Sequence, residues 1–118
     1  MKRLNLEYNE LLAEGAKTLF EGILVSNIIE LNIRGNGLAN RGLSQIADVL
    51  LSNGELHHKL KHLDLSSNDL TEEGVDDLIL ILSHLDLKSL NVSKNNLGDV
   101  GIIQLLSKTK EESLGSNL

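Results

Sequence analysis

Three residues of one short segment, His62, Asp64 and Ser66, have the side-chain types of a nucleophilic triad. They alternate along an expected strand, and alternate residues of a strand point to the same face. Residues two apart on a strand are about 7 Å apart at the backbone, however, and nothing in the surrounding sequence suggests an oxyanion hole. We therefore do not expect catalysis there, and we interpret the chain as non-enzymatic.

Histidines are the next candidates, because neutral imidazoles bind transition metals. The chain has four of them: His57, His58, His62 and His84. Three fall within 57–62, a spacing that matches no recognised ligand pattern, and no acidic residue completes a set. There is no cysteine, which removes thiol nucleophiles and cysteine-based zinc sites. We expect neither a metal nor a cofactor.

A phrase repeated four times shows what must position these residues. The copies are LNLEYNEL, LNIRGNGL, LDLSSNDL and LNVSKNNL, and the sixth residue of each is an asparagine: Asn9, Asn36, Asn68 and Asn95. These asparagines are 27, 32 and 27 residues apart. A phrase with such a period indicates stacked repeats. We expect one domain, 1–118, with units at about 1–27, 28–59, 60–86 and 87–113 and a tail at 114–118.

Each unit changes its period halfway. If positions are counted from the residue aligned with Met1, positions 4 and 6 are apolar between polar neighbours, as in a half-buried strand. After a recurrent glycine, apolar residues follow the i, i+3, i+4 spacing of a helix that buries one face. We expect Thr71 and Asp99 to cap the third and fourth helices, and 52–54 to end the second.

The repeated asparagines Asn9, Asn36, Asn68 and Asn95 stand where each strand ends. A side-chain amide there can satisfy backbone groups that a turn leaves unpaired, and stacked copies would form a ladder. We interpret them as structural. The polar column at position 5 is expected to bond along the stack in a similar way.

With its glycine, the phrase resembles the leucine-rich repeat family, and within it the ribonuclease-inhibitor-like class, L-x-x-L-x-L-x-x-N-x-L-x-x-x-G-x-x-x-L. The resemblance covers nearly the whole chain. It implies a curved α/β solenoid of four strand–turn–helix units, with parallel strands on the concave face and helices on the convex face. It also implies that the chain binds protein. The second unit is longer than the pattern, so we expect a loop near 52–59.

Composition limits the partners. The formal net charge of -6 argues against nucleic acid, which proteins bind by neutralising phosphates with lysine and arginine. Only 2% of residues are aromatic, which does not suit an aromatic-lined ligand pocket. No secretory signal and no apolar run long enough to span a membrane are visible. We expect a cytoplasmic protein, and export by a route that needs no signal fits the same observations.

The concave face carries our candidate partner-binding residues. Interface hot spots favour tyrosine, tryptophan and arginine, and on that face these types fall only in the first two units. The candidates, with the position-3 residues beside them, are Arg3, Tyr8, Glu30, Arg34 and His62. The alternative is an ordinary solvated strand face.

Both ends of the array break the repeat pattern. No polar cap precedes the first unit, which leaves an open layer of Leu4, Leu6, Leu11, Leu19 and Ile23. The chain is then either a fragment or minimal solenoid, or a homo-oligomer through its uncapped ends. In the last helix, Val100 and Ile103 replace polar residues, so either the tail from 111 to 118 folds over them or they form a self-association patch.

The preferred hypothesis is a non-catalytic module that binds a protein whose identity the sequence does not give. One alternative is a self-assembling structural solenoid. Another is a bacterial effector that mimics host repeat proteins.

Overall fold

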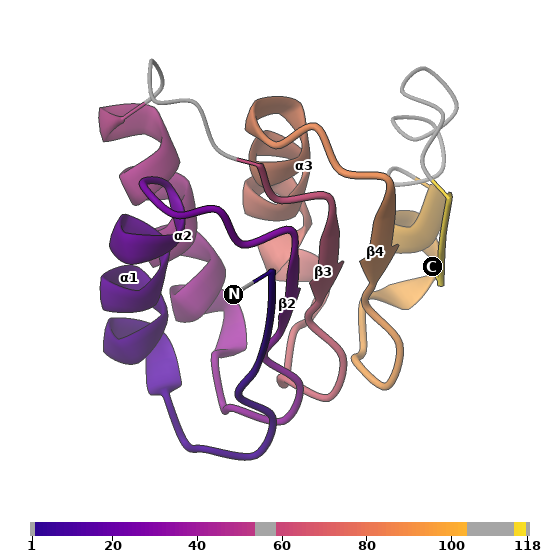
Figure 1. The fold of residues 1–118 in the computed structure, drawn as a ribbon. Coiled ribbons are helices and arrows are strands. Elements are labelled where there is room, and N and C mark those ends of the chain that lie inside the picture. Colours follow the sequence, from indigo (N-terminus) through magenta and orange to yellow (C-terminus); the bar gives the residue numbers. More distant parts are fainter. Residues whose placement is uncertain (1, 54–58, 104–114, 118) are drawn as a thin grey trace.

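Five short strands form one parallel sheet in the order in which they occur in the chain (Figure 1). The computed structural model describes residues 2–53, 59–103 and 115–117. The strands are β1 (Arg3–Asn5), β2 (Glu30–Asn32), β3 (His62–Asp64), β4 (Ser89–Asn91) and β5 (Gly115–Asn117). Leu4, Leu31, Leu63 and Leu90 pair in one row, so equivalent positions of successive units lie side by side.

Helices cover one face of this sheet (Figure 1). They are α1 (Leu12–Ile23), α2 (Ala39–Ser52) and α3 (Val75–His84), the last preceded by the 3-10 turn η1 (Glu72–Gly74), and 98–103 is also helical. Leucines at strand position 4 meet the apolar helix faces in one aliphatic core with a single phenylalanine, Phe20. The expected α/β solenoid of strand–turn–helix units is therefore confirmed.

The helical pattern misses two buried residues, Val49 of α2 and Ile81 of α3. Ile79, which the pattern places in the buried stripe, is only half-buried. The reason is that an interior helix packs against the sheet and also against the neighbouring helices. It therefore buries a wider face than a single stripe.

A left-handed backbone residue follows each of the strands β1 to β4 at position 8: Tyr8, Gly35, Ser67 and Lys94, with φ values of 57°, 67°, 54° and 55°. Three of the four are not glycine, and such a conformation costs about 1–2 kcal/mol per L-residue. It persists because hydrogen bonds hold the turn from the neighbouring unit.

Those bonds come from the turn asparagines. Asn68 is fully buried, and its Oδ1 accepts the N–H groups of Asn36 at 2.8 Å and Leu38 at 3.4 Å. Its Nδ2 donates to the carbonyls of Ile33, Leu65 and Ser66 at 3.0–3.1 Å. Asn36 and Asn95 likewise each accept two N–H groups of the unit before them. Each interior amide therefore fastens the turn of the preceding unit.

The polar column at position 5 acts differently from the expectation. Each side-chain oxygen of this column accepts the backbone N–H of the residue two positions later, at 2.9–3.0 Å. The acceptors are Asn5, Asn32, Asp64 and Asn91, and the donors are Glu7, Arg34, Ser66 and Ser93. An aspartate or asparagine side chain reaches that amide directly in such a turn. Bonding along the stack is limited to Asn32 Nδ2, which donates to Glu7 at 3.3 Å, within the part of the chain that the structure describes.

Neither expected helix cap is present. Thr71 has the extended backbone of a cap, but its hydroxyl accepts a bond from Asn40 Nδ2 at 2.7 Å, and Asn40 Oδ1 accepts the Thr71 N–H at 3.0 Å. The Thr71 hydroxyl, which would cap the helix, thus bonds instead to Asn40 of the preceding unit. Asp99 lies inside the helical segment 98–103, because the turn already closes at Gly98, whose φ is 74°.

The ends also differ from expectation. Ile23, assigned to the open layer, is buried, since it packs in the last turn of α1 within the core around Leu24 and Ile28. The tail residues 115–117 pair with β4 as a fifth strand instead of lying over Val100 and Ile103, which are 64% and 62% exposed. The remaining tail residues and most of the expected loop, 54–58 with His57 and His58, lie outside the described residues.

The asparagine network gives a test with a control in the same phrase. Asn68→Ala should lower the free energy of unfolding by about 3 kcal/mol, because it leaves the buried N–H groups of Asn36 and Leu38 and the Ile33 carbonyl without a partner. Asn9 is exposed and donates only to two carbonyls of its own turn. Asn9→Ala should therefore change stability by only about 0.5 kcal/mol. Urea unfolding of both variants measures the difference, and equal losses would contradict this account of the turn.

Candidate functional site

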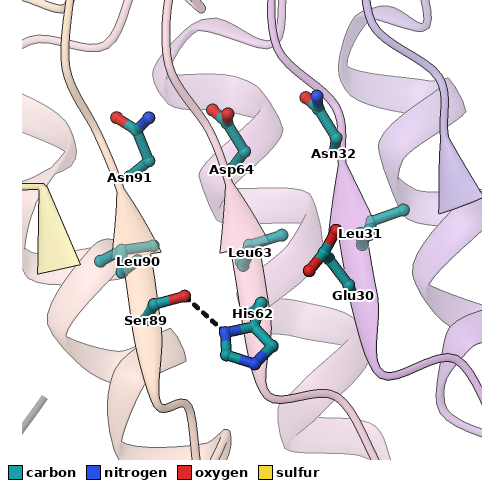
Figure 2. A pocket seen from close by; sticks show the side chains of 9 residues that line it. All are labelled: Glu30, Leu31, Asn32, His62, Leu63, Asp64, Ser89, Leu90 and Asn91. Atoms are coloured by element: carbon teal, nitrogen blue, oxygen red, sulfur yellow. Dashed lines mark hydrogen bonds between the residues drawn. The ribbon is translucent and has the colours of Figure 1, made fainter. Parts of the chain in front are cut away.

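The face of the sheet that the helices leave open carries two rows of polar side chains. Figure 2 shows Glu30, His62 and Ser89 in one row and Asn32, Asp64 and Asn91 in the next. The leucines between them, Leu31, Leu63 and Leu90, are buried on the helix side. Alternation along each strand thus presents a polar surface that crosses three units.

These rows line an open depression of about 230 Å³. Typical small-molecule pockets are larger, about 300–1,000 Å³, and mostly apolar. A shallow polar hollow across neighbouring strands suits contact with another macromolecule better than enclosure of a ligand.

The three triad-type residues do not act on one another as a triad requires. His62 Nδ1 lies 2.7 Å from Ser89 Oγ on the next strand (Figure 2). The Ser66 hydroxyl donates to Asp64 Oδ1 and is fully buried, whereas the sequence places it on the open face. The tight turn after β3 causes the difference, because Asp64 also accepts the Ser66 N–H.

Acidic and histidine side chains are likewise dispersed. Among the described residues, no three groups of the kinds that bind metals stand close enough to share an ion. Of the histidines in that part of the chain, His62 lies on the open face and His84 ends α3.

Two candidate residues, Tyr8 and Arg34, form a defined pair at one side of this face. Arg34 Nε donates to Tyr8 Oη at 2.9 Å, and the guanidinium carbon lies 5.9 Å from the centre of the ring. Tyr8 is 63% exposed, yet the bond and the stacking hold it in one place. The structure thus combines a surface aromatic ring and an arginine from adjacent units.

Sequence reasoning missed what supports this pair. A Cβ on Gly35 would meet the Tyr8 ring at 2.4 Å, and a Cβ on Gly37 would meet Leu12 at 3.1 Å. The second unit therefore lacks side chains at positions 8 and 10, and Tyr8 and Leu12 of the first unit occupy that space. Leu12 remains 55% exposed. The signal was a glycine aligned with Tyr8 in the next unit.

The other candidates are less firmly fixed. Arg3 Nε lies 3.8 Å from Glu30 Oε2, and both side chains are largely exposed. A pair of this kind contributes little to stability. Val100 and Ile103 lie on the helical segment 98–103 and are not part of the open face. The structure therefore brings together Tyr8 with Arg34 and Arg3 with Glu30, and keeps the apolar pair separate.

No helix in the described ranges is both long and apolar enough to cross a membrane.

Comparison with known proteins gives two matches. A family model described as Leucine Rich repeat matches residues 26–47, 57–78 and 83–106, which is more than half of the chain. The chain is also similar to NACHT, LRR and PYD domains-containing protein 13 of Homo sapiens, with 38% identity over 77 residues. The aligned segment is 64% of this chain but 7% of that protein, so the chain matches a small part of its relative.

The glycine beneath Tyr8 can be tested. Gly35→Ala should displace the tyrosine ring and lower stability by about 1–2 kcal/mol, because φ at Gly35 is 67°. Ser67 has the same position in the third unit and is already not glycine, so Ser67→Ala should change stability by about 0.5 kcal/mol or less. Urea unfolding gives the stabilities, and the NMR signal of the Arg34 Nε–H reports loss of the tyrosine. The interpretation fails if that signal is unchanged in Gly35→Ala.

Proposed function

This chain belongs to the leucine-rich repeat family, and we propose on that premise that it is a single protein-interaction module that binds through the open face of its sheet. Repeats of this family suggest such a role. The activity of the much longer human relative is not transferred with it, since the two share only one segment.

The observation that carries this proposal is the Tyr8–Arg34 pair. Tyrosine and arginine are the side chains on which protein interfaces most depend. Ordering a mobile side chain at an interface costs about 0.5–1.5 kcal/mol. Tyr8 and Arg34 are already held by the hydrogen bond between them, and the Tyr8 ring packs over Gly35. Much of this ordering is therefore already present in the unbound protein.

The rest of the face supports recognition of a protein surface. It is polar and mixed in sign, with Arg3, Glu30 and His62 along one row and no deep pocket in its described part. The acidic net charge disfavours nucleic acid as the partner. We propose that the module acts in the cytoplasm and has no catalytic activity of its own.

Partner capture tests the site. The purified chain should retain its partner from a cell extract, and Tyr8→Ala and Arg34→Ala should each weaken that retention about tenfold or more, as expected for hot spots. Lys94 occupies position 8 of the fourth unit and has the same left-handed backbone. Lys94→Ala is therefore the matched control and should retain the partner.

The comparison must be repeated with the captured protein in purified form, by calorimetry, to show that contact is direct. Equal binding by wild type, Tyr8→Ala and Arg34→Ala would refute this site. Circular dichroism of each variant shows whether the fold is retained.

A second candidate function, self-association, is favoured by one observation. Val100 and Ile103 are largely exposed on one face of the segment 98–103, where other units carry charged or polar residues. Burying each side chain would contribute about 1.5–3 kcal/mol. Contact with a second copy would bury both side chains.

Ile103→Asp tests this candidate, because a charge there opposes burial while an exposed site tolerates it. We expect the fold to be unchanged and any oligomer of the wild type to become a monomer in light scattering over a concentration series. Lys17→Asp makes the same replacement at the equivalent position of the first unit and serves as the control. An oligomer that survives Ile103→Asp would exclude this patch as the contact.

A further inference from the structure

Arg34 is the exception among the three arginines of the chain. Arg41 Nη2 lies 2.6 Å from Glu14 Oε1 on the helix side, and Arg3 forms an ion pair with Glu30. Arg34 forms no ion pair with any residue that the structure describes. This holds although the chain has 17 acidic residues against 11 lysines and arginines.

The nearest candidate counterion in the register is Glu7, which holds the same position 7 in the first unit. Its Oε2 instead accepts a bond from Asn32 Nδ2 at 3.3 Å. Arg34 Nε is committed to Tyr8, and the two Nη groups have no hydrogen-bond partner among the described residues. The fold therefore orients a guanidinium but leaves its charge uncompensated.

We propose that Arg34 receives a carboxylate of an aspartate or glutamate side chain on the protein partner. The planar guanidinium presents parallel N–H groups that match a carboxylate in a two-bond pair. The bond from Nε to Tyr8 fixes the plane of the guanidinium and leaves the Nη groups for the ligand. This inference rests on the proposed function and adds the chemistry of the partner.

The apolar neighbours define what should stand beside that acid. The Tyr8 ring and Leu12 are 63% and 55% exposed, and both lie over the glycines of the second unit. The Tyr8 ring offers an apolar surface next to the guanidinium. The partner segment should thus carry an acidic residue next to an aliphatic residue.

Phosphate polymers are the other ligands that suit an arginine. The net charge of -6 opposes the approach of a polyanion, whereas one carboxylate needs only a local cation. The carboxylate is therefore the ligand we argue for, and a phosphorylated peptide becomes an outcome of the test.

The chain has only three arginines, so an NMR spectrum of the arginine Nε–H groups has three side-chain signals. The probe is a short peptide of otherwise neutral residues with one leucine–glutamate pair, acetylated and amidated at its ends. The Arg34 signal should shift and saturate, while those of Arg3 and Arg41 stay, since each already has a carboxylate. The same peptide with glutamine should bind about tenfold more weakly.

Two variants separate charge from orientation. Arg34→Lys keeps the charge but loses the paired N–H groups, and Tyr8→Phe keeps the ring but loses the hydroxyl that accepts the Nε bond. Each should weaken glutamate-peptide binding several-fold, as measured from the backbone amide shifts of the second unit. Glu7→Gln should leave binding unchanged or strengthen it.

The inference is overturned if the glutamine peptide binds as well, if Arg34 shifts no more than Arg3 and Arg41, or if only a phosphoserine peptide binds. Its failure is distinguishable from failure of the proposed function. If partner capture needs Tyr8 but is unaffected by Arg34→Met, the open face remains the site and the carboxylate is rejected. If neither residue affects capture, both proposals fall.

Discussion

The turns after β1, β2 and β3 depend on one interaction, the bond between an asparagine side chain of the next unit and two backbone N–H groups of the turn. The turn contains left-handed residues that are mostly not glycine, and its donors point into a region without water. Without the amide, those donors would be unpaired at a cost comparable to a lost buried hydrogen bond. The parallel strands, the alignment of equivalent positions and the polar open face all follow from a turn that closes in the same way in each unit.

The proposed binding surface uses the same turn. Position 8 is left-handed in every unit, and in the first unit the side chain there reaches across to the second unit. Between the first and second units this geometry brings Tyr8 over Gly35 and beside Arg34. The backbone of the turn therefore fixes the positions of the side chains on this surface. A change that loosened the turn would also disperse the aromatic ring and the arginine.

The period, the alternation of strand and helix, and the layered architecture could be predicted from the sequence because each depends on spacing within one unit. Contacts between units were harder to predict from the sequence, since they depend on which residues of neighbouring units are aligned. Asn40 bonds to Thr71, and Tyr8 fills the space over Gly35. Within the third unit, the turn directs Ser66 inward to Asp64. The exposure of Ile23 was also misjudged, because burial at the end of α1 is set by packing against Leu24 and Ile28. None of these follows from periodicity alone.

The asparagine bonds also give the array a direction. Each asparagine oxygen accepts from the unit before it, so the backbone donors of one turn rely on the next unit. Loss of the first unit would leave Asn36 Oδ1 unused and remove the Leu6 carbonyl from its Nδ2, which still donates to Arg34. Opening of the third unit would leave two buried N–H groups of the second unit without a partner. Orphaned donors are rarer in proteins than under-used carbonyl oxygens. In the turns, loss of a unit should therefore destabilise the unit before it more than the unit after it.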